Sequence, residues 1–267
     1  MASLLRIVVV LYQVPLRSLR PLLEDLRAAS VGLDAVVTVV SNRDDIVDRV
    51  RSPRAVQLGQ GLRLEAVYQH NRYGVAGAYN YAIQRAAPED LLILLDGDAR
   101  LGGRYFSEVA SRRTRLATGI CFATLEQFSG RMRVSPYAMV GSVPRPIDGT
   151  LAGPILKFAD GVGVINSGLA GSVASFRAVD GFSSDMPLDL SDVVWSREAA
   201  RKRAELLLLP MRHSHDLSMQ SAGFSAQRLG KYLVACWRIT QKTGDVMGGL
   251  RLTMRGLRAF RWSSLWT

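Results

Sequence analysis

A run of aliphatic residues that ends in two aspartates constrains the fold of this chain most. Residues 91–98 have the sequence LLILLDGD, so a continuous apolar segment runs directly into two carboxylates. An apolar run of this length predicts a central parallel strand that is buried on both faces. Ligands bind beyond the carboxyl ends of such strands, and a divalent cation carrying a diphosphate would offset the repulsion between Asp96 and Asp98. Capping of the following helix or turn is the alternative interpretation.

The segments around this strand predict further strands and helices in alternation. Strands that alternate with helices indicate a parallel sheet with right-handed crossovers. From Thr118 to Gly171 the chain is rich in Gly, Pro and Ser, and such long loops in a compact domain are usually functional. The expected strands are Ile7 to Tyr12, Ala35 to Val40, Leu64 to Tyr68, Leu91 to Leu95, Ile120 to Thr124 and Leu206 to Leu209; the expected helices follow Ser18 and cover Asp45 to Arg51, Gly74 to Ala87 and Ser191 to Arg203.

Charge and cysteine content narrow the class of protein. The net charge of +11 favours anionic partners, namely nucleotide diphosphates, nucleic acid or an acidic membrane surface. No nucleic-acid recognition motif is present, so we expect no nucleic-acid partner. The only cysteines, Cys121 and Cys236, lack a C-x-x-C partner, which argues against a disulfide scaffold or a zinc site. We find neither a signal peptide nor an apolar run long enough to span a membrane, and we expect a cytoplasmic protein.

The C-terminal part differs in composition from the rest. Residues 226–267 contain eight basic residues and one acid, Asp245. On a helix, Met247, Leu250, Met254 and Leu257 share one face, with Arg251, Arg255 and Arg258 beside it. A basic amphipathic helix of this kind predicts peripheral contact with an anionic membrane at its inner face; packing on the domain with solvated arginines is the alternative. We therefore divide the chain into a domain of residues 1–222, with halves 1–100 and 101–222, and a helical basic segment, 223–267.

Two further motifs flank the aspartate pair. Asn71 to Asn80 is a small-residue segment that opens a helix, where backbone amides can approach an anion. After the loops comes PLDLSDVVW, residues 187–195, in which Asp189 and Asp192 lie one helical turn apart at a helix start. His213 and His215 follow the last predicted strand.

In this order and spacing, the motifs resemble the family 2 glycosyltransferases, inverting enzymes of the GT-A fold, and among them the rhamnosyltransferase-like members. Matching features include the Asn71 to Ile83 segment, D-x-D at Asp96 and Asp98, an S-G stretch that includes Gly168, and D-x-x-D-x-x-W from Asp189 to Trp195. The resemblance implies a Rossmann-like, mixed but mainly parallel sheet flanked by helices. One departure concerns base recognition, because Ser41 and Asn42 stand where the family usually has an aspartate.

The resemblance also implies a reaction and roles for individual residues. A sugar would move from a nucleotide-diphosphate sugar to a glycan or polyprenyl-linked acceptor in surface polysaccharide synthesis, with Mg²⁺ or Mn²⁺ stabilising the leaving diphosphate and an aspartate acting as general base. The implied base is Asp192; the implied metal ligands are Asp98 and His215; the implied donor-binding residues are Tyr12, Ser41, Asn42, Asn71, Gly74, Asn80 and Asp96; and the implied acceptor-binding residues are Gly168, Asp189 and Trp195.

Other classes of protein fit the sequence less well. A haloacid dehalogenase-type phosphatase also has hydrophobic residues followed by D-x-D, but there the motif follows the first strand. A dinucleotide-binding dehydrogenase would need G-x-G-x-x-G after the first strand, where this chain has LYQVP, residues 11–15. A non-catalytic nucleotide- or membrane-binding module remains if Asp192 is not positioned as a base.

Overall fold

The structure, a computed structural model, describes most of the chain. The described residues are 4–11, 19–29, 34–41, 56–59, 61–68, 74–97, 99–151, 153–186, 189–214 and 225–263. The helix predicted after Ser18 is present as α1, which begins at Arg20, whereas the helix predicted over Asp45 to Arg51 lies outside these ranges.

The N-terminal half forms the predicted parallel sheet. Strand β5 (Leu91–Asp96) lies beside β1 (Leu5–Leu11), followed by β2 (Ala35–Ser41) and β4 (Leu62–Tyr68), all parallel. Every residue of β2 and all but the last of β5 are buried, as expected for β-branched and aliphatic strands covered on both faces. A short strand that the sequence did not predict, β3 (Val56–Gly59), pairs antiparallel with β4 at the edge.

The second half extends the same sheet and makes it mixed. Strand β12 (Leu169–Ser172) runs antiparallel between β5 and β6 (Cys121–Ser129), and β13 (Glu205–Ser214) runs parallel to β6. The strand order among the described residues is β10-β13-β6-β12-β5-β1-β2-β4-β3, with β7 also paired to β6. The Gly- and Pro-rich segment thus contains strands: β7 (Met132–Ser135), β10 (Ile155–Lys157) and a separate sheet of β8 (Tyr137–Val140), β9 (Val143–Pro146) and β11 (Val162–Gly163).

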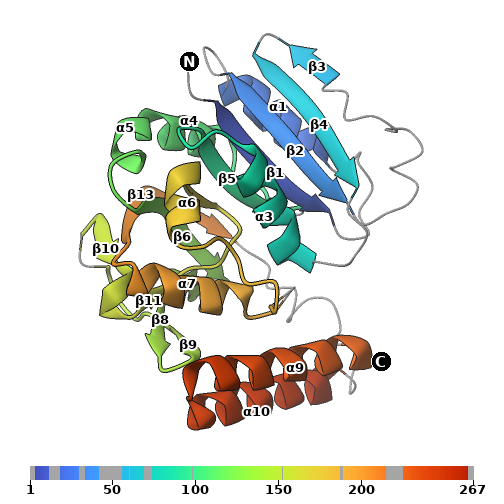
Figure 1. The fold of residues 1–267 in the computed structure, drawn as a ribbon, viewed down its shortest axis with the longest axis vertical. Coiled ribbons are helices and arrows are strands. Elements are labelled where there is room, and N and C mark those ends of the chain that lie inside the picture. The colour runs from blue at the N-terminus through green and yellow to red at the C-terminus, as the bar shows by residue number, and fades with distance from the viewer. Residues whose placement is uncertain are drawn as a thin grey trace.

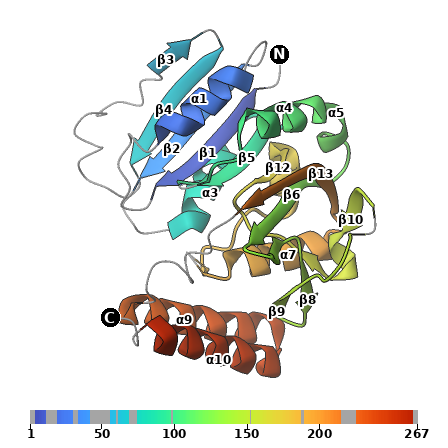
Figure 2. The ribbon, with the colours of Figure 1, turned by 180° about the vertical axis from the view of Figure 1, so that it is seen from behind.

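Helices cover both faces of the sheet. Helices α3 (Gly74–Arg85), α6 (Val173–Ala178) and α7 (Ser191–Arg201) pack on one face (Figure 1). Helices α1 (Arg20–Ala29), α4 (Gly103–Ser111) and α5 (Arg113–Leu116) pack on the other (Figure 2). A 3-10 turn, η2 (Phe158–Asp160), leads into β11. The predicted α/β architecture is confirmed.

The basic C-terminal segment is a helical hairpin. Helices α9 (Ala226–Thr243) and α10 (Val246–Ser263) lie side by side at one end of the molecule, beyond α7 and β9 (Figure 1). Gly249 and Gly256 allow the helices to approach closely, since a Cβ atom at either position would overlap a side chain of α9. These two glycines, which have low intrinsic helix propensity, are therefore packing positions.

A third apolar cluster holds the hairpin on the α/β body. It joins residues of α9 and α10, such as Ile239 and Leu252, to Tyr137 and to Val193 of α7. Asp245, between the two helices, accepts hydrogen bonds from the amides of Ser142 (2.7 Å) and Gly248 (2.8 Å). Within the described residues, no helix is both long enough and apolar enough to cross a membrane. The division at residue 222 remains a prediction.

Candidate functional site

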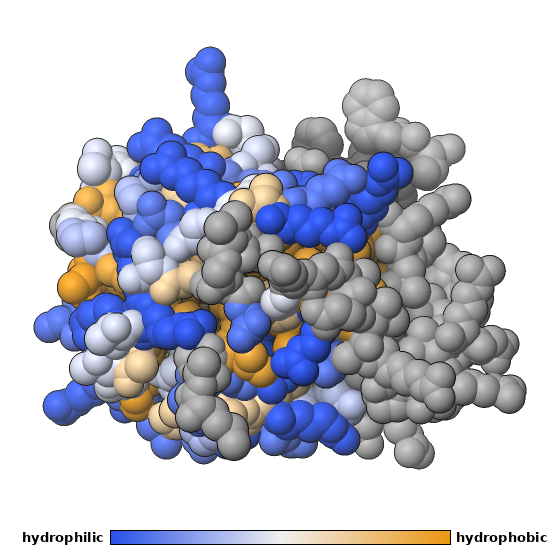
Figure 3. Space-filling model, turned by 90° about the horizontal axis from the view of Figure 1, so that it is seen from above, coloured by the Kyte–Doolittle hydropathy of each residue, from blue (hydrophilic) through white to orange (hydrophobic). Residues whose placement is uncertain are grey.

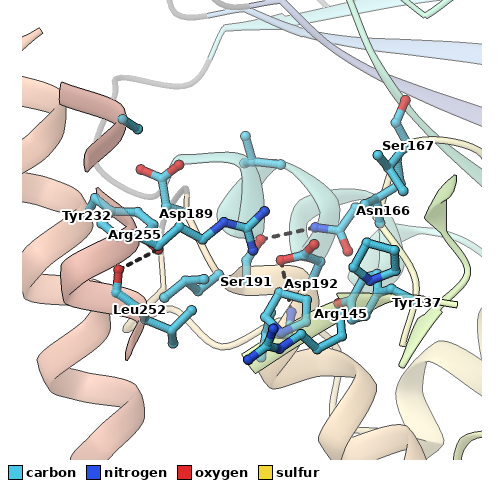
Figure 4. A pocket seen from close by; sticks show the side chains of 18 of the residues that line it. Tyr137, Arg145, Asn166, Ser167, Asp189, Ser191, Asp192, Tyr232, Leu252 and Arg255 are labelled. Carbon is cyan, nitrogen blue, oxygen red and sulfur yellow. Dashed lines mark hydrogen bonds between the residues drawn. The ribbon is translucent and has the colours of Figure 1, made fainter. Parts of the chain in front are cut away.

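A cavity of about 410 Å³ lies where the end of β5, the start of α7 and the hairpin meet (Figure 4). The small sheet and the segment before β12 close its other sides. The residues that line the cavity include Asp96, Tyr137, Arg145, Asn166, Ser167, Asp189, Leu190, Ser191, Asp192, Arg228, Tyr232, Leu252, Arg255 and Ala259.

Asp96 is the last residue of β5 and brings the first carboxylate to the cavity. Its Oδ1 accepts a hydrogen bond from the Tyr79 hydroxyl at 3.2 Å, and its amide donates to Ser167 Oγ at 3.1 Å. The next residue, Gly97, is closely packed against β1: a Cβ atom there would lie 2.6 Å from Leu11 Cδ2 and 3.1 Å from the Val10 carbonyl oxygen. The strand end is thereby fixed in place.

Asp192 lies in the first turn of α7 and faces the same cavity. Its Oδ1 accepts a hydrogen bond from the Val193 amide at 2.9 Å. Burial raises the pKa of this carboxyl to about 6, and the negative charges of Asp189 and Asp96 add to the rise. Asp192 therefore gains and loses its proton just below neutral pH, which is the property required of a general base.

Asp189 reaches the cavity because the chain turns sharply before α7. Leu190 has a left-handed backbone (φ 62°), a conformation that costs a non-glycine residue energy and is found preferentially at functional sites. Asp189 Oδ1 lies 3.3 Å from Arg228 Nη2 on α9. Burial raises the pKa of Asp189, and the charge of Arg228 opposes that rise.

Buried polar atoms without partners gather at this cavity. Asn166 donates from Nδ2 to Ser191 Oγ at 3.0 Å, but its Oδ1 accepts nothing from the described residues, and neither does Asp189 Oδ2. A buried acceptor left unsatisfied costs about 1–3 kcal/mol. These two atoms are available to accept hydrogen bonds from a ligand that carries donors.

Several cavity residues were missed in the sequence. Tyr137 is buried next to Asp192; burial first, and then the Asp192 charge, raise the pKa of its phenol well above the ordinary range. Arg145 and Arg255 come from β9 and α10 and line the same space (Figure 4). Asn166 and Ser167 had a local signal, because they belong to the S-G stretch of the motif.

Three residues predicted to bind donor or acceptor have packing or backbone contacts in the structure. Trp195 has an exposed fraction of 0% and packs among phenylalanines; its ring is stacked on that of Phe182, with 5.7 Å between the ring centroids. A fully buried indole offers no face to a sugar, so we do not assign it to the acceptor site. Asn80 exchanges two hydrogen bonds with the backbone of Phe182 (2.7 and 2.8 Å). Gly168 has φ 80° and donates its amide to the Leu94 carbonyl at 2.8 Å, which aligns the start of β12 with β5.

The remaining predicted donor and metal residues are placed as follows. Ser41 is buried at the end of β2, and Gly74 begins α3 with φ 56°. Neither lines the cavity. Tyr12, Asn42, Asn71, Asp98 and His215 lie outside the described residues.

Asp96 brings one carboxylate to this cavity, and carboxylate oxygens are the ligands that Mg²⁺ or Mn²⁺ prefers. The predicted metal ligands Asp98 and His215 lie outside the described residues. Asp96 and Asp189 already raise the pKa of Asp192, so a cation here would relieve repulsion among the three carboxylates. Among the described residues alone, no group of three or more His, Cys, Asp or Glu side chains forms a metal site.

Known structures resemble this one over nearly the whole chain. The crystal structure of GalNAc-T7 with UDP, GalNAc and Mn²⁺ matches with a TM-score of 0.58 at 12% identity, covering 90% of this chain and 48% of that one. The mannosyltransferase PcManGT from Pyrobaculum calidifontis, with GDP-Man and Mn²⁺, matches with a TM-score of 0.59 at 14% identity, covering 98% and 73%. The chain has the GT-A glycosyltransferase fold.

A third structure agrees with this fold. S. aureus TarS, residues 1–349, in complex with UDP-GlcNAc, matches with a TM-score of 0.52 at 15% identity, covering 96% of this chain and 72% of that one. The sequence matches no protein-family model and no curated protein. The chain spans about half the length of GalNAc-T7, 48%, and at these identities the likeness establishes the fold.

Proposed function

We propose that this protein is a metal-dependent inverting glycosyltransferase, of hexosyltransferase type, that transfers a sugar from a nucleotide-diphosphate sugar to a glycan or polyprenyl-linked acceptor. The observation that carries the proposal is that Asp192 and Asp96 line the same cavity, at the end of the central strand of a GT-A fold. Structural neighbours with UDP-GlcNAc or with GDP-Man and Mn²⁺ support a nucleotide-sugar donor.

The donor side of the proposed site is built around Asp96. Asp96, Asp98 and His215 would hold Mg²⁺ or Mn²⁺, which stabilises the negative charge of the departing diphosphate when bound. The hydrogen bond from Tyr79 and the backbone link to Ser167 fix the direction of the Asp96 carboxylate. The predicted donor residues Tyr12, Asn42 and Asn71 follow from the resemblance to family 2 alone.

On the acceptor side, Asp192 acts as the general base. Its carboxylate takes the proton of an acceptor hydroxyl, whose oxygen attacks the anomeric carbon while the bond from that carbon to the diphosphate oxygen breaks. A base with a pKa of about 6 is ionised at neutral pH yet more basic than an ordinary aspartate, and general-base assistance contributes typically 10²–10⁴-fold. Asp189 and Asn166 offer the unsatisfied oxygen atoms that would orient acceptor hydroxyl groups.

Burial of Asp192 raises its pKa toward neutral, which favours this reaction over a non-catalytic binding module, because strongly shifted pKa values cluster at catalytic sites. We assign the protein to surface polysaccharide synthesis at the inner face of the membrane. Both the pathway and the location follow from the family resemblance and the basic hairpin.

Donor binding and donor hydrolysis test the proposed function without knowledge of the acceptor. The protein is titrated calorimetrically with UDP-, dTDP- and GDP-linked sugars, with Mn²⁺ and with EDTA, and slow release of free sugar is followed. We expect at least one donor to bind only with the metal. If none of the donors binds in a metal-dependent way, the proposal is refuted.

An Asp192→Asn variant distinguishes a base from a donor-binding residue. We expect it to bind the donor normally and to release sugar about 10²-fold or more slowly. Asp148→Asn, which changes an exposed aspartate that does not line the cavity, is the matched control and is expected to match the parent protein. Loss of donor binding in Asp192→Asn would reassign that residue to the donor site.

A further inference from the structure

Exposed apolar side chains are concentrated on the hairpin. Ten large hydrophobic residues are exposed among the described residues, and seven of them lie on α9 or α10. The seven are Val234, Trp237, Val246, Met247, Leu250, Met254 and Leu257, with exposed fractions from 39% to 64%. At the opposite end of the molecule, seen from above, the visible described residues are mainly hydrophilic (Figure 3).

These side chains form one face of α10. Val246, Leu250 and Leu257 recur at helical spacing, and Met247 and Met254 widen the same face. The opposite face carries Leu252, which is fully buried, and Gly256, which packs on Tyr232. We call the five exposed residues of α10 the apolar row. A row of this length left in water is unusual for a protein surface and marks a binding face.

The charges beside the apolar row are almost all positive. Arg251, Arg255 and Arg258 follow the row along α10 and are exposed, and no carboxylate within the described parts of the chain forms an ion pair with them. The single acid of the segment, Asp245, is engaged with the amides of Ser142 and Gly248. The exposed side of the hairpin is therefore apolar and cationic.

We propose that this face of α10 docks on an anionic phospholipid surface, with the apolar row in the interface and the arginines at the lipid phosphates. A cationic amphipathic helix lies in such an interface with its apolar face among the acyl chains, and each arginine near an anionic leaflet adds to the attraction. A second copy of the chain fits this face poorly, because a two-fold contact would bring the two sets of arginines together.

Docking would bring the cavity next to the lipid surface. Leu252, Arg255 and Ala259 line the cavity from the same helix that carries the apolar row. Only the width of a helix, about 10 Å, then separates the lipid surface from the cavity wall. This consequence, a lipid-linked acceptor that enters past Arg255, rests on the proposed function; the docking itself does not.

Vesicle flotation of the full chain tests the docking. The vesicles are phosphatidylcholine alone and phosphatidylcholine mixed with phosphatidylglycerol. We expect the protein to float with the mixed vesicles, much less with phosphatidylcholine alone, and less at high salt because salt screens the arginines. Leu250→Ser/Leu257→Ser is expected to weaken binding about tenfold or more, and Arg251→Gln/Arg258→Gln about fivefold per arginine.

Matched variants control for the number of changes. Val140→Ser/Ile155→Ser removes two exposed apolar side chains of β8 and β10 that do not belong to the apolar row, and Arg104→Gln/Arg131→Gln removes two exposed arginines from the α/β body. Both are expected to float like the parent. Circular dichroism and donor titration on each variant confirm that the fold persists.

The outcomes separate this proposal from the proposed function. Binding that survives loss of Leu250 and Leu257, or equal binding to both kinds of vesicle, would overturn the docking. A concentration-dependent dimer in analytical ultracentrifugation that Leu250→Ser/Leu257→Ser abolishes would assign the face to a second copy instead. If the parent protein binds no nucleotide sugar but the hairpin variants still lose flotation, the docking proposal is supported and the proposed transferase function is refuted.

Discussion

Replacing Asp192 by asparagine should lower activity and raise stability at the same time. The pKa of Asp192 lies at about 6 in the folded protein, against an ordinary value of 3.8. The difference of about 2.2 pH units, at 1.36 kcal/mol each, corresponds to about 3 kcal/mol. This is an upper estimate of what the ionised carboxylate costs the fold, because burial disfavours its charge.

The sign of the effect follows from proton linkage. Since the folded-state pKa is raised, the folded protein binds this proton more tightly than the unfolded chain does. The stabilisation is complete below about pH 4 and is lost as the pH rises through about 6. Asparagine carries no charge and keeps an oxygen that can accept from the Val193 amide. Asp192→Asn should thus be more stable than the parent by up to about 3 kcal/mol above pH 7, with no difference near pH 4.

Urea unfolding at these two pH values, followed by circular dichroism, measures the difference. Asp148→Asn, which changes an exposed aspartate, controls for the loss of one negative charge and should leave stability unchanged at both pH values. An Asp192→Asn variant no more stable than the parent above pH 7 would refute the burial argument. It would also remove the physical reason for choosing Asp192 as the base.

Three further changes test other parts of the structure. Asp90→Ala should lower the free energy of unfolding by about 3–5 kcal/mol, because the Asp90 carboxylate accepts from Arg6 Nε at 2.5 Å and from the Leu4 amide at 2.8 Å. Urea unfolding measures the loss, with Asp34→Ala, at an exposed aspartate, as the control. Equal free energies of unfolding for the two variants would contradict this prediction. Gly168→Ala should destabilise the protein by about 1–3 kcal/mol, and thermal denaturation should show a larger effect than for Gly119→Ala. Both glycines have a positive φ, but of the two only Gly168 would place a Cβ atom against a side chain, at 3.0 Å from Leu125 Cδ2. Asp96→Asn should abolish Mn²⁺-dependent nucleotide binding in calorimetry and lower the pKa of Asp192 by removing a nearby negative charge; unchanged binding would exclude Asp96 from the donor site.

The parallel half of the sheet could be predicted because its strands have a strong local signal. Residues 91–95 are aliphatic without interruption, and such a run has few stable positions other than a buried strand. The antiparallel insertion of β12 had no comparable signal, since four residues, LAGS, do not reveal which strands they join. Nor could the sequence show that Gly249 and Gly256 are packing positions, because their partners Thr240 and Tyr232 belong to another helix.

Some of the residues that line the cavity could be identified from local sequence motifs. Asp96 and Asp192 belong to short motifs, and both line the cavity. Trp195 belongs to the same motif as Asp192, but the motif alone could not tell that α7 turns the tryptophan into the aromatic core. Tyr137 and Arg255 reach the cavity from distant segments, so only tertiary packing brings them there.

Asp96 and Gly97 are neighbours with opposite tolerances. Asp96 can change to asparagine without a change in volume, so its substitutions should be folded and inactive. At Gly97, any side chain would press on Leu11 and the Val10 carbonyl, so its substitutions should be poorly expressed whatever their polarity. A saturation library scored separately for protein abundance and for donor turnover would therefore show, for each residue of this motif, whether substitution impairs folding or activity. It would show how much of a short signature reflects chemistry and how much reflects assembly of the strands.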